Sequence, residues 1–281
     1  MKKVLIPTDF SDNAWDALTY AIRLYDDIPC CFYILNTFLV GASRTSNIKN
    51  RARNTHIYQL MKEESEVELK EIKDHLEKHL LNNKHQYKTL SRSGTLTDVV
   101  TALVEKEGFD LLVMGTTGAS GPKEFFMGSN TVHVIKHVAK CAILSVPYKY
   151  EYNEIQRALF ATDFKHTFKK EDLKCLIELQ LIHNFKINIV HIKQEDELNT
   201  LQMQNKDYLQ SCLGDSTFEF RELISNNGIA TTLDQFAIDE KINLISLLNY
   251  EHSFIEMITH EAVIKNISFH SNIPLLILPV K

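Results

Sequence analysis

Hydrophobic residues along the chain follow two alternating spacings. Short runs rich in β-branched and aromatic residues are separated by longer stretches in which apolar residues recur at the spacing of a helix. In the first half this pattern predicts strands at 3–7, 30–37, 86–91, 110–114 and 141–147, alternating with helices at 12–25, 62–82, 96–107 and 129–138. Right-handed crossovers between parallel strands place helices on both faces of the sheet. The pattern therefore predicts a doubly wound α/β fold.

The same pattern occurs a second time. The residues KVLIPTDF at 3–10 recur as RALFATDF at 157–164, and each copy precedes an amphipathic segment and an apolar strand. The later apolar runs correspond as well: 30–38 with 185–192, 109–115 with 242–248, and 141–147 with 274–280. In the second copy we expect helices at 168–184, 196–213, 230–241 and 254–267. The repeat predicts two tandem domains, 1–150 and 151–281, that meet in the polar stretch 148–156.

Composition and charge narrow the class of protein. A chain of 281 residues with 44% hydrophobic and 24% charged residues can bury a core. Its net charge of −5 excludes a dedicated nucleic-acid-binding protein, which needs a basic surface. Only a short apolar run precedes Asp9, so we expect neither a signal peptide nor a membrane span, and we expect a cytoplasmic protein. Five cysteines without C-x-x-C spacing indicate reduced, buried thiols.

Two local signals mark helix starts, and one segment stands out by its charge. Ser11 follows the first strand as a predicted N-cap, and Thr95 with Asp98 forms a variant of the capping box. Residues 41–62 are basic without any acid, whereas 63–77 are strongly acidic. We interpret them as a solvated loop that leads into a solvated helix face. The alternative is a basic flap near a bound phosphate.

Candidate binding chemistry gathers at two predicted strand ends. Pro7-Thr8-Asp9 follows the first strand, and Gly115-Thr116-Thr117-Gly118 follows the fourth. With the strand order 3-2-1-4-5 these strands are neighbours, so both features face one crevice at the carboxyl edge of the sheet. Gly128-Ser129-Asn130-Thr131 then opens a helix whose free N–H groups and positive dipole end suit phosphate oxygens. The pattern predicts a phosphate cradle without a lysine, and a nucleotide is its natural ligand.

The spacing G-x2-G-x9-G-[ST], read at Gly115, Gly118, Gly128 and Ser129, joins an N-terminal strand that ends in PTDFS. This combination resembles the ATP-binding branch of the universal stress protein family, over the whole chain as a tandem pair. The resemblance implies two five-stranded parallel sheets of order 3-2-1-4-5 and binding of ATP or a related adenine nucleotide. It places Asn36 where many relatives have histidine. The binding residues that it implies are Pro7, Thr8 and Asp9 beside the adenosine, Thr37 at the adenine, Met114 flanking the site, and Gly115, Gly118, Gly128, Ser129, Asn130 and Thr131 at the ribose and phosphates.

The second copy departs from this motif. Asp163 is kept, but Leu248 and Glu251 stand near the positions of Gly115 and Gly118, and residues 258–260 replace the later glycine. Side chains at former glycines obstruct the approach of a ligand, and a carboxylate repels phosphate. We therefore expect one nucleotide site per chain. The family resemblance further implies that 141–147 pairs with 274–280 inside one chain as an intramolecular pseudo-dimer.

The functional expectation is a cytoplasmic stress-response protein that acts as a nucleotide-dependent regulator of an unidentified protein partner. Its cofactor is ATP, with Mg²⁺ as an optional companion that Asp9 could help to hold. No catalytic residue and no metal site are predicted, so hydrolysis is expected to be slow at most. Neither nucleic acid nor membrane is an expected partner, and further assembly into a homodimer stays open. The alternatives are a nucleotide-free scaffold and, less favoured, an adenylyl-transfer enzyme.

Overall fold

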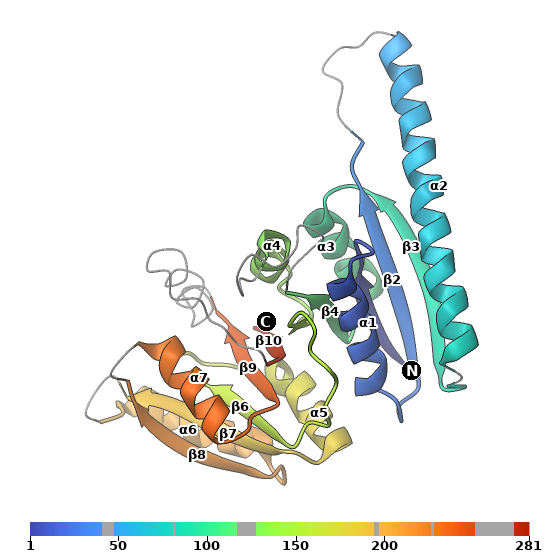
Figure 1. Cartoon of the computed structure of the whole chain (residues 1–281). Coiled ribbons are helices and arrows are strands. Elements are labelled where there is room, and N and C mark those ends of the chain that lie inside the picture. Colours follow the sequence, from blue (N-terminus) through green and yellow to red (C-terminus); the bar gives the residue numbers. More distant parts are fainter. Residues whose placement is uncertain are drawn as a thin grey trace.

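Ten strands form one continuous sheet in the computed structural model, in the order β3-β2-β1-β4-β5-β10-β9-β6-β7-β8 (Figure 1). The structure describes residues 1–40, 48–80, 82–116, 128–193, 197–225, 228–250 and 273–280, with the side chains of 48–54 left out. Each half of the sheet has the predicted order 3-2-1-4-5 with parallel strands. The doubly wound α/β prediction is therefore confirmed in both copies.

The elements alternate along the chain as the apolar pattern predicts. The strands are β1 (Lys2–Pro7), β2 (Cys30–Phe38), β3 (His85–Ser93), β4 (Leu111–Gly115), β5 (Ala142–Val146), β6 (Arg157–Ala161), β7 (Lys186–Lys193), β8 (Phe218–Ile224), β9 (Leu244–Asn249) and β10 (Leu275–Pro279). The helices are α1 (Asp12–Leu24), α2 (Ile48–His79), α3 (Leu96–Glu107), α4 (Ser129–His137), the 3-10 helix η1 (Lys170–Leu173), α5 (Lys174–His183), α6 (Thr200–Leu213) and α7 (Ile229–Asp239).

Two apolar layers cover the two faces of the sheet. One layer contains residues of α1, α2, α5 and α6, such as Leu18, Leu69 and Leu176. The other contains residues of α3, α4 and α7, such as Val104 and Val134. Because both faces are covered, the central strands are apolar at nearly every position, as parallel sheets require.

The two halves join through an antiparallel ladder. Leu144 of β5 lies opposite Leu276 of β10, and Ile143 lies opposite Ile277. The expected pairing of 141–147 with 274–280 inside one chain is present. Side chains add to the junction, because Lys2 Nζ lies 2.6 Å from Glu178 Oε2 on α5. Burial works against this ammonium, but its bonds to Glu178 and Asp110 outweigh burial and raise the pKa of Lys2.

The long helix α2 differs from the sequence prediction. It begins at Ile48 rather than at residue 62, and it extends past the end of the sheet (Figure 1). The expectation of a loop at 41–62 is therefore wrong for 48–62, while 41–47 lies outside the described residues. Residues 48–62 contain neither glycine nor proline, so nothing in the backbone stops the helix. Basic residues indicate that the segment is exposed to solvent, but they do not indicate whether it is a helix or a loop.

Smaller expectations hold or shift by a few residues. Ser11 Oγ accepts the Ala14 N–H at 3.3 Å, and Thr95 Oγ1 accepts the Asp98 N–H at 3.2 Å, so both predicted N-caps are confirmed. The helical segment predicted at 168–184 starts as a 3-10 turn at Lys170. The helix predicted at 254–267 lies outside the described residues.

The cysteines are buried and reduced, as predicted. All five are free thiols inside the core. Burial raises the pKa of Cys30 to about 12, which keeps its thiol protonated and unreactive near neutral pH. Within the described ranges, no helix combines the length and apolar character needed to cross a bilayer.

Candidate functional site

The carboxyl ends of β1 and β4 form one edge of the sheet. The two strands are neighbours, with Leu5 opposite Leu112. From this edge β1 leads into α1 on one face, whereas β4 leads toward α4 on the other. Ligands of doubly wound sheets bind where successive connections leave in opposite directions. The structure thus places the turn after Pro7 and the end of β4 at the same edge of the sheet, and Thr131 of α4 bonds to Gly115 there.

The turn after β1 is tightly held. The Thr8 N–H donates to Leu35 O at 2.8 Å, and Thr8 Oγ1 accepts the Phe10 N–H at 3.0 Å. Phe10 has a φ of 63°, in the left-handed region that side chains rarely adopt. Asp9, at the exposed tip, accepts the Ser11 N–H at 3.2 Å through Oδ1. This turn holds the Asp9 carboxylate at the edge of the sheet, close to the N-terminus of α1.

A buried amide fixes the same turn from β2. Asn36 Nδ2 donates to Thr8 O at 2.8 Å, and the Asn36 side chain is buried. In the second half, His191 on β7 takes the equivalent position and its Nδ1 contacts Thr162 O at 3.1 Å. Because a histidine N–H and an amide N–H can both donate to this carbonyl, the two residue types are interchangeable here. The contact gives a structural reason for the asparagine at position 36.

Gly115 ends β4 directly against α1. A Cβ at this position would overlap the side-chain amide of Asn13, which is only 2% exposed. The glycine is therefore required by the packing of α1 on β4, whether or not a ligand is bound. In the second half Leu248 occupies the equivalent register position, as the sequence predicted.

Two hydrogen bonds return the chain from the loop after β4 to the start of α4. The Gly128 N–H donates to Thr116 O, and Thr131 Oγ1 donates to Gly115 O at 2.9 Å. Thr131 is buried, and its hydroxyl hydrogen is engaged with the carbonyl rather than free for a phosphate. These bonds hold the first turn of α4 beside the end of β4. Gly118 lies between them, outside the described residues.

Among the described residues, no side chain caps the N-terminus of α4. Gly128 is the N-cap and offers no side chain, and the first turn contains no acidic residue. Ser129 and Asn130 are exposed there. The first N–H groups of a helix have no partner within the helix, and the positive end of the helix dipole favours an anion. This end of α4 therefore suits phosphate oxygens.

The remaining residues of the predicted set differ in accessibility. Pro7 is buried at the end of β1, and Met114 is buried in the apolar layer together with Leu5 and Val134. Thr37 is half-buried near the end of β2, opposite Arg92 of β3. Pro7 and Met114 are therefore part of the packed interior below this edge, whereas the side chain of Thr37 is partly accessible.

The corresponding turn of the second half is covered by side chains of α6. Gln202 Nε2 donates to Asp163 O at 2.9 Å, and Asn205 Nδ2 donates to Phe164 O at 2.8 Å. Both amides are buried. The carbonyls after β6 are thus satisfied within the protein.

An aromatic pair occupies the same edge of the second half. The ring of Tyr250, just after β9, stacks on His166 with centroids 4.5 Å apart, and its hydroxyl donates to Thr167 O at 3.1 Å. Burial raises the pKa of Tyr250. Glu251 and residues 258–260, also invoked from the sequence, lie outside the described residues. Side chains fill the described part of this second edge.

Several of these residues carry no sequence signal for their role. Three polar residues occupy helix positions that face the core, namely Asn13, Gln202 and Asn205. Periodicity alone does not predict which backbone group each side chain contacts. A polar residue on an otherwise apolar helix face was the one available signal. It marks a buried hydrogen bond in general, because buried polar groups need partners.

The chain matches known proteins at the level of family and fold. The model of the universal stress protein family matches residues 1–147. Universal stress protein MJ0531 of Methanocaldococcus jannaschii is 31% identical over 145 residues, which cover 52% of this chain and 81% of that protein. Universal stress protein MJ0577 of the same organism is 25% identical over 148 residues, covering 48% and 88%.

The structure of a universal stress protein from Archaeoglobus fulgidus extends the likeness to both halves. It covers 99% of this chain and 98% of its own length, with a TM-score of 0.70 and 15% identity, which shows a shared fold. The family model covers more than half of the chain. The chain therefore belongs to the universal stress protein family.

Proposed function

We propose that the N-terminal half, residues 1–150, binds ATP or a related adenine nucleotide, and that the chain is a nucleotide-dependent regulator in the cytoplasm. In this proposal the C-terminal half, 151–281, is a degenerate copy that packs against the first. The observation that carries the proposal is the first turn of α4, which has no side-chain cap and no acidic residue and is held at the end of β4, the strand next to β1.

The described residues fit the parts of such a ligand. The exposed Ser129 and Asn130 and the free N–H groups of α4 provide donors for phosphate oxygens. The exposed carboxylate of Asp9 is the kind of oxygen ligand that Mg²⁺ prefers. The half-buried Thr37 would lie at the adenine. We include Gly118 and the rest of the phosphate loop because they are part of the sequence motif.

Regulation is favoured over turnover. A phosphoryl-transfer enzyme needs a group that orients the attacking water and a cation that stabilises the transition state. The motif at this edge, PTDFS with Gly115, Gly118, Gly128 and Ser129, contains no arginine or lysine to act as that cation. We therefore expect slow hydrolysis at most. A bound nucleotide acts on a partner only if it binds two conformations of the chain with different affinity.

Calorimetric titration with Mg-ATP tests the proposal. The parent chain is compared with a variant whose substitution lies on the exposed surface and leaves the fold intact. Asn130→Glu places a negative charge in the first turn of α4, which stabilises the helix end but repels phosphate. The matched control is Thr231→Glu in the first turn of α7, a helix that also starts at a glycine N-cap. We expect one site per chain, an affinity at least about tenfold lower in Asn130→Glu, and no change in the control.

Other outcomes would contradict this proposal in distinct ways. Two sites per chain would show that the filled second half also binds. An equal loss in both variants would point to a nonspecific effect of charge. No heat at millimolar nucleotide would favour the nucleotide-free scaffold, which the fold supports through one specific observation: Gly115 is already required by its contact with Asn13.

A further inference from the structure

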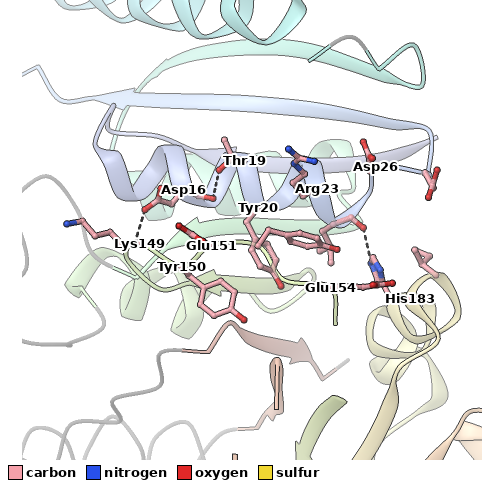
Figure 2. Close-up of a pocket in the computed structure, with 14 residues that line it drawn as sticks. Asp16, Thr19, Tyr20, Arg23, Asp26, Lys149, Tyr150, Glu151, Glu154 and His183 are labelled. Carbon is pink, nitrogen blue, oxygen red and sulfur yellow. Dashed lines mark hydrogen bonds between the residues drawn. The ribbon is translucent and has the colours of Figure 1, made fainter. Parts of the chain in front are cut away.

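A cavity lies away from this sheet edge, at the junction of the two halves. It has a volume of about 940 Å³ and lies between α1, the connecting segment 149–154 and the end of α5 (Figure 2). This volume is within the range of small-molecule sites in proteins. Its charged and aromatic lining consists of Asp16, Tyr20, Arg23, Asp26, Asp27, Lys149, Tyr150, Glu151, Tyr152, Glu154 and His183.

Carboxylates dominate the charge of this junction cavity. Five of them face two cationic side chains, Arg23 and Lys149. Asp16 Oδ2 accepts the Lys149 N–H at 2.9 Å, and Asp27 pairs with Lys84 at 3.1 Å. The carboxylates of Glu151 and Glu154 make no hydrogen bond or ion pair with any described residue. The cavity thus keeps an excess of negative charge at the segment that connects the halves.

Three tyrosines form the apolar wall. The ring of Tyr20 lies 5.2 Å from that of Tyr152 and 5.9 Å from that of Tyr150. Figure 2 shows Tyr20 extending from α1 toward the connecting segment. Tyr20 is 1% exposed, and its hydroxyl has no hydrogen-bond partner among the described residues. Buried hydroxyls usually have a partner, and a donor bound in this cavity would supply one for Tyr20.

His183 adds an acceptor rather than a charge. Its Nε2 lies 2.9 Å from Leu24 O, so this nitrogen carries the hydrogen. Burial lowers the pKa of His183, which keeps the ring neutral near pH 7 and leaves Nδ1 as an acceptor. The cavity therefore offers carboxylates, phenol oxygens and one imidazole nitrogen to a donor-rich ligand.

We propose that the junction cavity binds a linear aliphatic polyamine. An alkylammonium group has three donors and no acceptor, which matches the free carboxylates of Glu151 and Glu154 and the unpartnered hydroxyl of Tyr20. The methylene chain packs on the tyrosine wall, and a charged amine over a tyrosine face gains a cation–π interaction. A compact metal ion would leave this aromatic surface unused.

The position of the cavity gives the ligand a structural role. α1 belongs to the first half and α5 to the second, so a bound polyamine contacts both halves and their connection. The site is separate from the proposed nucleotide site, because it lies along Asp16–Leu24 of α1, whereas Ser11 caps the N-terminus of that helix. Because a ligand favours the conformation that it binds more tightly, occupancy of this cavity stabilises the arrangement of α1, the connection and α5 that forms it.

Calorimetry with spermidine tests the proposal on the full chain. We expect binding at one site per chain. The double variant Glu151→Gln, Glu154→Gln should lower the affinity by about tenfold, because two charge pairs are lost. The matched control is Glu64→Gln, Glu68→Gln, which removes the same charge from the exposed surface of α2 and should leave the affinity unchanged. Thermal unfolding of each variant confirms that it is folded.

Tyr20→Phe separates ligand binding from packing. The change keeps the ring but removes the unpartnered hydroxyl, so it should weaken spermidine several-fold without lowering the unfolding temperature. Three results would overturn the proposal. The first is an equal loss of spermidine affinity in both glutamine double variants, and the second is equal competition by Mg²⁺ at matched ionic strength. The third is no heat of binding at millimolar spermidine. Binding of trilysine without binding of spermidine would also overturn it, because it would indicate a docking site for a basic peptide. None of these readings depends on nucleotide binding.

Discussion

The side-chain amide of Asn13 fills the space into which a Cβ of residue 115 would project. Asn13 is buried in the first turn of α1, and Gly115 is the last residue of β4. In the second half, Leu248 takes the place of the glycine, and the sequence counterpart of Asn13 is Thr167, which lies ahead of the helical segment at Lys170. The helical segment of the second half thus begins only three residues after the counterpart of Asn13, whereas α1 already includes Asn13 itself.

This contact predicts that Gly115→Ala destabilises the chain by about 1–3 kcal/mol, the usual cost of overpacking a core. Removing the obstacle with Asn13→Ala in the same chain should recover part of that loss. Urea unfolding of the two single variants and the double variant gives the coupling free energy. Strictly additive effects would show that the two side chains do not compete for this space.

The bond from Asn36 to the Thr8 carbonyl leads to a second prediction. Asn36→Ala leaves the buried carbonyl of Thr8 with one donor fewer, which should cost about 1–3 kcal/mol of unfolding free energy. Asn36→His should be nearly neutral, because His191 serves the equivalent carbonyl in the second half. Chemical unfolding compares the two variants. Similar losses for alanine and histidine would mean that the hydrogen bond contributes little.

Asp234 on α7 should give the stability of the chain a specific pH dependence. Burial raises the pKa of Asp234 from 3.8 to about 6. A raised carboxyl pKa favours the folded state fully below about pH 3.8, and this contribution is lost as the pH rises through about 6. Asp234→Asn should therefore stabilise the chain at pH 7 by roughly 1 kcal/mol, after allowance for partial exposure.

The advantage of Asp234→Asn should shrink toward zero as the pH falls to 4. Urea unfolding at pH 7, 5.5 and 4 measures this trend. Asp215→Asn, an exposed change in the turn after α6, is the matched control and should show no such trend. A constant difference between Asp234→Asn and the parent chain at all three pH values would contradict the assignment.

The repeat and the apolar runs were sufficient to predict the sheet. They depend on local sequence, and the two copies of KVLIPTDF and RALFATDF fix β1 and β6 in equivalent places. The start of α2 was missed because charge, not helix propensity, guided the interpretation of 48–62. For the candidate site, the sequence predicted that the ends of β1 and β4 lie at one edge, since strand order alone brings them together.

The side-chain contacts that complete these sites could not be predicted. Thr131 bonds to Gly115 and Gln202 bonds to Asp163 across distances in sequence that no periodic pattern encodes. The tyrosines at 150 and 152 were interpreted only as part of a polar connection. Their contact with Tyr20 depends on how the connection lies against α1, which is decided by tertiary packing.

The antiparallel ladder between β5 and β10 makes the contact between the halves independent of protein concentration. Two separate chains would associate to an extent set by their dilution, whereas tethered halves meet at an effective concentration that is roughly millimolar for short connections. The first half and its divergent copy are therefore always present in equal numbers. Substitutions in the second half can therefore change the surface that it presents next to the first half. Every molecule carries the same pair of halves, so no mixture of different dimers forms.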